Sequence, residues 1–510
     1  MEGSALEKIL MILEVSRKQD YIFASRKLRE NAARSGDIAY VTGGDFFRTA
    51  ANGLYREEEN LVYSGGGHTV LQFDGREQAA AFAKCVTGTV LRQYDGLELF
   101  VKQMPYDGAK TPGENLKALS AELERKKSVR RSGFRLLSLG VEELDRESYS
   151  PVSLGGTPDR RPRQNGRLKP PAGWDDFPAE LDRLAGRDNF IAVVHIDGNA
   201  MGKRVDRVYE RSGRDWESCR AGLRRFSEAI QRDFEDAFME MADEVSRRLP
   251  ESASVLPVRP VILAGDDVCF VSAGNIGLEC ARVFLERLAA KTNSEDGGSY
   301  SACAGVALVH TRFPFHRAYD LAEELCSSAK RFGAALDPDG RVSAMDWHIE
   351  FGEMKYSLEK LRKDYVCEDS TDERPSRMEL RPVAVIVPGG CGDPGARTYE
   401  FFKSLCTAVG SGRGGIARGK IKNLRQAFKQ GALESEYYLH DKQIGGLFSR
   451  AFDAQYSPPD RRSTGSREGV RGETAGPKEV FREMDGVRRC LFFDAVEMMD
   501  HFTAFEEMKA

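Results

Sequence analysis

The middle of the chain alternates between short apolar runs and longer stretches with helical periodicity. The apolar runs predict strands at 191–196, 258–263, 268–271 and 301–310, and the helical stretches lie at 216–248, 276–292 and 316–332. This order is β-α-β-β-α-β-α, the split βαβ or ferredoxin-like pattern with one added helix. The pattern therefore predicts an α+β domain in this region.

The first hundred residues repeat the same order. Strands are predicted at 10–15 and 97–104, helices at 19–35 and 75–93, and a hairpin at 60–73. An overlay of the two copies aligns the hairpin tip 66–68 (Gly-Gly-His) with 265–267 (Gly-Asp-Asp), and 15–16 (Val-Ser) with 196–197 (Ile-Asp). An internal repeat of this length indicates two copies of one domain. In this overlay only the second copy carries acidic residues.

Three stretches rich in proline, glycine and charge interrupt the periodic pattern, at 149–175, 367–380 and 456–478. They predict a first domain over 1–148, a linker over 149–175 and a middle domain over 176–365. A helix-rich C-terminal domain follows over 366–510, with a mobile loop at 456–478.

Composition narrows the class of protein. The 510 residues carry 75 Lys and Arg against 79 Asp and Glu, a net charge of −4, which excludes a polybasic nucleic-acid coat or an acidic tail. No apolar run approaches the roughly 18 residues that cross a bilayer. The ten cysteines are scattered without a CxxC pair or a secretion signal. Reduced thiols in a cytoplasmic protein without a membrane partner are the expectation.

Three carboxylates are expected to meet in the middle domain. Asp197 ends a buried strand, and Asp266 and Asp267 lie at the tip of a hairpin whose strands neighbour it in a split βαβ sheet. Converging carboxylates resist joint ionisation unless a cation lies among them, and their hard oxygens suit Mg²⁺ or Mn²⁺. Two such ions would support phosphoryl transfer. The alternative is that the Gly-Asp-Asp segment only forms a turn.

A glycine-containing turn follows Asp197 directly. Backbone N–H groups between a strand and a helix favour phosphate oxygens. The turn is therefore expected to hold the triphosphate of a nucleotide, through Gly198, Asn199, Ala200, Met201 and Gly202. Lys330, on the helix after the last strand, would contact the β- and γ-phosphates, unless it is only a solvated surface lysine.

These segments resemble a known family. VVHIDGNAMGKRV, LAGDDVCFV, SACAGVALVHTRFPFHRAYDLAEELCSSAKR and SAMDWHIEFG are similar to the catalytic palm of the large subunit of type III CRISPR effector complexes. SRKQDYIFASRKLRENAARSGDIAYVTG resembles the start of that subunit's first, non-catalytic palm, and GKIKNLRQAFKQG resembles its C-terminal helical domain. Ala264 replaces the first glycine of the family's GGDD motif. A more distant resemblance is to GGDEF-type nucleotide cyclases.

The resemblance implies two ferredoxin-like palm domains and a C-terminal helical domain, in a compact form without the HD nuclease domain. It also implies conversion of ATP into cyclic oligoadenylate messengers with two Mg²⁺ or Mn²⁺ ions, in antiviral defence. Metal ligands are expected at Asp197, Ile196, Asp266 and Asp267. Nucleotide contacts are expected at 198–202, Gly265, Lys330 and, beside the base, Ser301.

Several alternatives stay open at this stage. The chain could be a scaffold subunit that binds nucleotide or RNA without turnover, or a cyclase that uses GTP. Nucleoside triphosphates are the expected small-molecule partners, and RNA, other CRISPR-like subunits or a second copy of the chain remain open as macromolecular partners. The bare hairpin tip at Gly66 and Gly67 is expected to border an acceptor nucleotide in a face-to-face pair of palms, or else to form only a turn.

Overall fold

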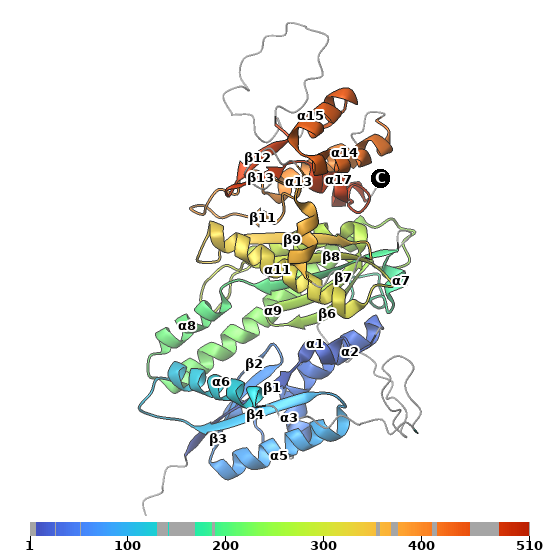
Figure 1. The fold of residues 1–510 in the computed structure, drawn as a ribbon. Coiled ribbons are helices and arrows are strands. Elements are labelled where there is room, and N and C mark those ends of the chain that lie inside the picture. Colours follow the sequence, from blue (N-terminus) through green and yellow to red (C-terminus); the bar gives the residue numbers. More distant parts are fainter. Residues whose placement is uncertain are drawn as a thin grey trace, which may run out of the picture.

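The computed structural model describes residues 7–25, 27–51, 53–129, 141, 169–185, 189–352, 357–368, 376–410, 416–448 and 479–508. The molecule is elongated, with an N-terminal domain, a middle domain and a C-terminal domain following one another along its length (Figure 1). Residues 130–140 and 142–168, which include most of the predicted linker, and the predicted loop at 456–478 lie outside the described residues. None of the described helices combines the length and apolar character that a bilayer crossing requires.

The N-terminal domain is a four-stranded sheet in the order β2-β3-β1-β4, which is the ferredoxin-like order. Its elements are β1 (Lys8–Ser16), α1 (Lys18–Ile22), α2 (Leu28–Val41), α3 (Gly44–Ala50), α4 (Glu57–Asn60), β2 (Leu61–Gly65), β3 (His68–Asp74), α5 (Arg76–Gln93), β4 (Glu98–Pro105) and α6 (Pro112–Ser128). The helix predicted over 19–35 is two helices. The chain breaks after α1, where the ring of Phe23 packs 4.5 Å from that of Tyr319 in the middle domain.

The middle domain contains the same arrangement, β8-β5-β7-β6, as four strands of a six-stranded sheet. Two further strands, β9 and β11, extend the sheet beyond β8, and the sequence pattern missed β9. Its elements are α7 (Leu181–Leu184), β5 (Phe190–Gly198), α8 (Met201–Ser212), α9 (Trp216–Arg248), β6 (Val258–Ala264), β7 (Asp267–Ala273), α10 (Gly277–Ala289), β8 (Ala302–His310), α11 (Phe315–Leu336), β9 (Ser343–Glu350) and α12 (Leu358–Arg362). The predicted α+β class with two ferredoxin-like domains is confirmed.

The C-terminal domain is mostly helical and includes a small sheet in the order β10-β13-β12. Its elements are β10 (Ser376–Arg377), β11 (Val383–Ile386), α13 (Tyr399–Gly410), α14 (Arg418–Gln430), α15 (Ala432–Asp441), β12 (Phe481–Met484), β13 (Val487–Cys490) and α17 (Phe493–Met498). Because β11 pairs with β9, this part of the chain also completes the sheet of the middle domain.

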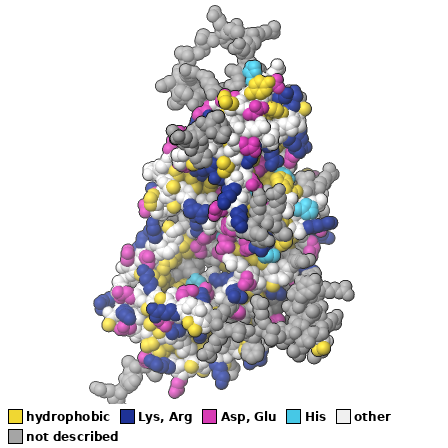
Figure 2. All heavy atoms as spheres, viewed as in Figure 1, with side chains coloured by type: hydrophobic (Ala, Val, Ile, Leu, Met, Phe, Trp, Pro, Cys, Tyr) yellow, Lys and Arg dark blue, Asp and Glu magenta, His cyan; other side chains and the backbone are white. Residues whose placement is uncertain are grey.

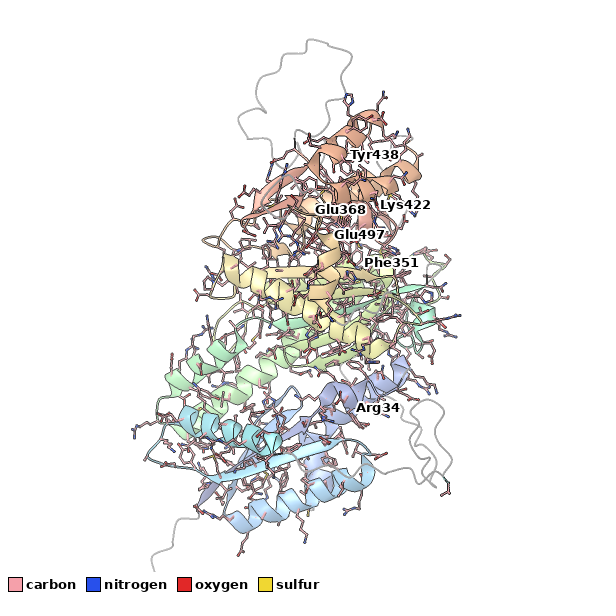
Figure 3. All side chains as sticks on the ribbon, in the orientation of Figure 1. Arg34, Phe351, Glu368, Lys422, Tyr438 and Glu497 are labelled. Atoms are coloured by element: carbon pink, nitrogen blue, oxygen red, sulfur yellow. The ribbon has the colours of Figure 1, made fainter. Side chains whose placement is uncertain are left out.

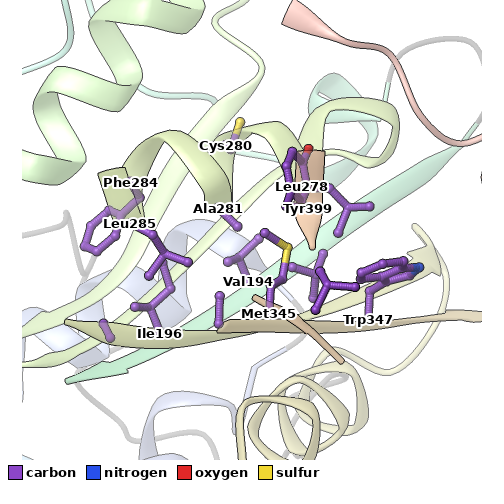
Figure 4. Packing of buried hydrophobic residues seen from close by; sticks show 14 of the residues in the cluster. Val194, Ile196, Leu278, Cys280, Ala281, Phe284, Leu285, Met345, Trp347 and Tyr399 are labelled. Carbon is purple, nitrogen blue, oxygen red and sulfur yellow. The ribbon is translucent and has the colours of Figure 1, made fainter. Parts of the chain in front are cut away.

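Strand β5 is buried on both faces, which explains its continuous apolar sequence. Val194 and Ile196 face α10, where they pack near Phe284 and Leu285, while Ile191 and Val193 face the opposite side of the sheet (Figure 4). The same core continues through Trp347 of β9 to Tyr399 of α13. The ten cysteines are free thiols, seven of them buried, as expected from their scatter.

The two ferredoxin-like domains pack against each other through α9. The Trp216 indole donates to the Gln72 side chain at 2.6 Å, and the Ser227 hydroxyl donates to the Ser64 carbonyl at 2.7 Å. Both acceptors lie on the hairpin of the N-terminal domain. The contacts hold that hairpin beside the middle domain, where the candidate site lies.

We predict that Gly305→Ala will destabilise the protein by about 3 kcal/mol or more, because α11 packs directly on β8 at this residue. A β-carbon there would lie 1.9 Å from the Ala322 carbonyl oxygen and 2.3 Å from the Cys326 nitrogen. Both are backbone atoms of α11 and cannot rotate away. The free energy of unfolding, from denaturant titration, measures the effect.

Gly446→Ala is the matched control, because nothing lies within 4 Å of a β-carbon added at that residue. We expect the control to change the free energy of unfolding by less than about 1 kcal/mol. Unchanged stability of Gly305→Ala would show that α11 does not rest on β8 as described.

Candidate functional site

Strand pairing brings the three predicted carboxylates to one edge of the middle sheet. Asp197, near the end of β5, is the cross-strand partner of Asp267, the first residue of β7. Asp266 lies in the turn between β6 and β7, and the Gly198 N–H donates to its carbonyl at 3.2 Å. Gly265 adopts a φ of 71°, which glycine reaches without strain. The acids converge as the sequence predicts.

Lys330 reaches this cluster from α11. Its ammonium nitrogen lies 2.6 Å from Oδ2 of Asp197 and donates to the Gly198 carbonyl at 3.0 Å. The two side chains are 32% and 41% exposed, so the pair is open to solvent and to a ligand. Lys330 is therefore placed at the predicted phosphate end of the site.

The turn after Asp197 is shaped by its first glycine. A β-carbon on Gly198 would lie 2.6 Å from Cε of Met201 and 2.9 Å from Cβ of Asp266, so a larger residue would push the turn away from the acids. Ala200 adopts a left-handed φ of 55° and is the N-cap of α8. At Gly202 an added β-carbon would meet nothing within 4 Å. The helix therefore begins beside the acids with open space at its first turn.

Asn199 and Ser301 connect this turn to the neighbouring loops. The Asn199 backbone N–H donates to the Ser301 carbonyl at 2.9 Å, and its side-chain amide donates to the Val342 carbonyl at 2.9 Å. The Ser301 hydroxyl donates to the Gly340 carbonyl at 2.6 Å. Asn199 thus has a structural role, and the contact of Ser301 with a base stays a prediction.

Like charge and partial burial raise the proton affinity of two of the acids. Removal from water, followed by the charge of Asp197, raises the pKa of Asp266 to about 6. The same two causes raise the pKa of Asp267 to about 6, opposed by Lys18 and Lys330. At neutral pH the ionised acids therefore repel one another, and the surrounding groups do not fully compensate this repulsion.

His195 is a site residue that the sequence reasoning missed. It precedes Asp197 by two positions on β5, so both residues point to the same face of the sheet. Its Nδ1 lies 3.6 Å from Oδ1 of Asp267, and neither atom has a hydrogen-bond partner within the described structure. Burial lowers the pKa of His195. The period of two along the strand was the signal that could have found it.

The donor set of this cluster fits a divalent cation. Within the described residues, no group of three His, Cys, Asp or Glu side chains is close enough to hold one ion by itself. The buried Oδ1 of Asp267 has no hydrogen-bond partner, however, and carboxylate oxygens with substrate phosphates are the usual ligands of Mg²⁺. The side chain of Ile196 packs in the core, so only its backbone carbonyl could serve as a ligand.

The N-terminal domain also has an acid at the corresponding position, which corrects the sequence overlay. Glu14 is the cross-strand partner of His68, as Asp197 is of Asp267. The Val15 N–H donates to the Gly67 carbonyl at 3.1 Å, just as Gly198 does to Asp266. Cross-strand pairing therefore aligns Glu14, and not Ser16, with Asp197. Position along the chain could not reveal this register.

Glu14 also forms an ion pair with a lysine, as Asp197 does. The Lys127 ammonium on α6 lies 2.9 Å from Oε1 of Glu14, as Lys330 on α11 lies beside Asp197. Burial, followed by the charge of nearby Lys18, lowers the pKa of His68 to about 4, so the imidazole is neutral at pH 7. The N-terminal copy therefore retains one acid and one lysine but lacks the pair of aspartates.

The hairpin tips of the two domains touch. A β-carbon on Gly66 would lie 3.8 Å from the Ala264 carbonyl, and one on Gly265 would lie 3.8 Å from the Gly66 nitrogen. Lys18 donates to the Gly66 carbonyl. Burial lowers the pKa of Lys18, and the nearby charge of Asp267 partly opposes this effect. At Gly67 a β-carbon would collide with Ile38, 2.9 Å away. The hairpin tip of the N-terminal domain thus lies against the hairpin tip of the middle domain that carries Asp266 and Asp267.

Comparison with known families identifies the domain that carries the acids. Residues 190–335 match the sequence model of the Cas10/Cmr2 second palm domain. The greater part of the middle domain is therefore similar to a Cas10/Cmr2 palm. No curated protein matches the chain.

Solved structures extend the likeness of fold beyond this palm. A Csm1–Csm4 cassette in complex with pppApApA has a TM-score of 0.54 and 14% identity, and the match covers 90% of this chain and 69% of that one. Cassettes in complex with cA3 and with one ATP both have a TM-score of 0.46, with 17% and 18% identity, and cover 65% of this chain. This chain spans about half the length of those two, 54% in each case.

The raised pKa values of the palm acids predict a pH-dependent effect of Asp266→Asn. The folded protein keeps protons on Asp266 and Asp267 up to about pH 6, whereas the unfolded chain releases them near pH 4. The stability that these groups contribute is therefore complete below pH 4 and is lost as the pH rises through 6. Without metal, the variant should melt on the order of 2 °C higher than the native chain at pH 8 and equally at pH 4.

Thermal melts in EDTA across this pH range measure the difference. Added Mg²⁺ should raise the melting temperature of the native palm more than that of the variant. A variant that is less stable than the native chain at pH 8 would contradict repulsion among the acids.

Proposed function

We propose that this chain is a metal-dependent nucleotidyltransferase that joins ATP into cyclic oligoadenylates, as the large subunit of a type III CRISPR effector complex. The observation that carries the proposal is the meeting of Asp197, Asp266 and Asp267 beside Lys330 on a Cas10/Cmr2 palm. Further support comes from the solved cassette of similar fold that holds pppApApA, a linear chain of three adenylates.

The proposed reaction joins two ATP molecules. A ribose hydroxyl of the acceptor attacks the α-phosphorus of the donor, the new phosphodiester bond forms, and pyrophosphate leaves as the hydroxyl proton is lost. Divalent cations would lower the pKa of the attacking hydroxyl and neutralise the phosphates. Asp197, Asp266 and Asp267 would hold these cations, and the affinity of the site for positive charge follows from its raised pKa values.

Lys330 and the turn at 198–202 would hold the donor triphosphate. The backbone N–H groups at the start of α8 lie directly after Asp197 and are suited to phosphate oxygens. The Lys330 ammonium pairs with Asp197. When cations occupy the acids, this ammonium would be released toward the β- and γ-phosphates, because a like charge then faces it.

The N-terminal domain would present the acceptor nucleotide. Its hairpin tip borders the palm tip at Gly66, and its copy of the site keeps the Glu14–Lys127 pair without the two aspartates. A lone acid neutralised by lysine is a poor cation site, so both ions would belong to the palm. The domain can then orient an acceptor without competing for metal.

We also propose that the chain works beside another CRISPR subunit. The solved structure of similar fold is a Csm1–Csm4 cassette. The expected substrate is ATP, and GTP remains the alternative until products are identified.

We predict that Asp267→Asn will reduce product formation by about 100-fold or more, because a lost metal ligand removes several kcal/mol of transition-state stabilisation. The chain, alone and with its subunit partners, would be incubated with labelled ATP or GTP and Mg²⁺, and products identified by mass spectrometry. Binding of Mg²⁺ and ATP would be followed in parallel by thermal shift.

Asp243→Asn on the exposed side of α9 is the matched control and should behave as the native chain. Normal synthesis by Asp267→Asn would refute the metal site. If the native chain binds ATP with Mg²⁺ but forms no product in any assembly, it is a nucleotide-binding scaffold.

We predict that Gly66→Phe will reduce synthesis by about tenfold or more while ATP and Mg²⁺ still stabilise the palm, because a bulky tip would displace the acceptor. Gly53→Phe is the control, since Gly53 also has a positive φ and an added β-carbon there would meet nothing within 4 Å. If both variants fold and synthesise product equally well, the hairpin tip does not border the acceptor nucleotide.

A further inference from the structure

A cavity lies beside α11, where the palm meets the C-terminal domain. Its volume is about 670 Å³, within the range of small-molecule sites. Its walls come from α11, β9 and α12 of the middle domain and from β10, β13 and the segment before β11. Basic and acidic side chains gather side by side across the middle of the face shown in Figure 2, at the level of α11.

Charged groups that line this cavity are buried with unused hydrogen-bonding atoms. On the basic side, Nε and Nη2 of Arg381, Nη1 of Arg362 and Nε of Arg489 have no hydrogen-bond partner within the described structure. On the acidic side, Oδ2 of Asp346 and Oε2 of Glu379 also have none. Arg381 is 1% exposed, so its guanidinium has left bulk water.

The same side chains are held rigidly by their other atoms. Nη1 of Arg381 donates to Asp494 at 3.1 Å and to Glu497 at 2.5 Å, and Glu497 lies where the C-terminal domain meets the palm (Figure 3). Nη2 of Arg362 donates to Asp346 at 2.5 Å. These pairs fix the direction of the unused N–H groups before any ligand arrives.

Although these charges are paired, each buried N–H group or carboxylate oxygen that lacks a hydrogen-bond partner is costly unless something satisfies it. Guanidinium N–H groups in a fixed plane match the oxygens of a phosphate, and carboxylate oxygens accept from hydroxyl or amine groups. The cavity is lined by as many acids as arginines. A simple anion would bind only the arginine N–H groups and leave the carboxylate oxygens without a partner. A ligand with a phosphate and several N–H or O–H donors would use both.

We propose that this cavity binds a nucleotide through its phosphate, with the carboxylates accepting from its ribose or base. None of the three palm acids lines this cavity, but α11 borders both the cavity and the acids. Arg331 lines the cavity and directly follows Lys330, which contacts Asp197. An occupant would therefore rest on the helix that positions the phosphate-contacting lysine of the palm.

Calorimetric titration of the full chain with AMP, adenosine and inorganic phosphate tests the proposal. EDTA would be present throughout, so that the palm acids repel phosphate. We expect AMP to bind and adenosine to bind at least about tenfold more weakly, the scale of one charge-assisted contact. Ser328→Trp, which fills the cavity from α11, and Arg331→Glu should each weaken AMP binding by at least that factor.

Arg312→Glu is the matched charge control, because Arg312 is exposed on the same domain and does not line the cavity. Lys330→Ala is the control for the palm site, and both controls should retain AMP binding. Loss of binding in Lys330→Ala together with normal binding in Ser328→Trp would place the nucleotide in the palm and overturn the proposal. Binding of phosphate without AMP, or no binding at all, would also overturn it.

Discussion

The pairing of Asp197 with Asp267 on adjacent strands is the constraint on which the rest of this structure depends. Directly opposed residues in a sheet lie close together, and like charges in such pairs destabilise the fold. The protein tolerates the pair because β5 is buried on both faces and cannot shift its register without exposing its apolar side chains. Lys330 offsets part of the repulsion, and the remainder is the physical basis of the proposed cation site.

The position of Lys330 depends in turn on how closely α11 approaches the sheet. Gly305 leaves room for the backbone of α11 to rest on β8, and Ala318 and Ala322 are small buried residues of that helix. A helix one side chain farther away could not place an ammonium 2.6 Å from Asp197. The contact between α11 and Gly305 of β8 therefore determines both the packing of the core and the position of Lys330 beside Asp197.

The two ferredoxin-like domains share an acid–lysine pair, but only the palm adds the two aspartates of the proposed metal site. Glu14 and Lys127 repeat the geometry of Asp197 and Lys330, while His68 stands opposite Glu14 where a second acid would be needed. A neutral imidazole beside an acid–lysine pair leaves little net charge. The N-terminal domain can therefore pack its hairpin tip against the palm without adding repulsion.

The sequence alone determined the two ferredoxin-like units, the buried strand β5 and the convergence of the three acids, because strand periodicity and the split βαβ order place those residues at one edge. It misaligned Glu14, since chain position does not report cross-strand register. It also missed His195 and the cavity beside α11. The cavity depends on contacts between residues as distant as Arg381 and Glu497, which only the packing of the C-terminal domain on the palm brings together.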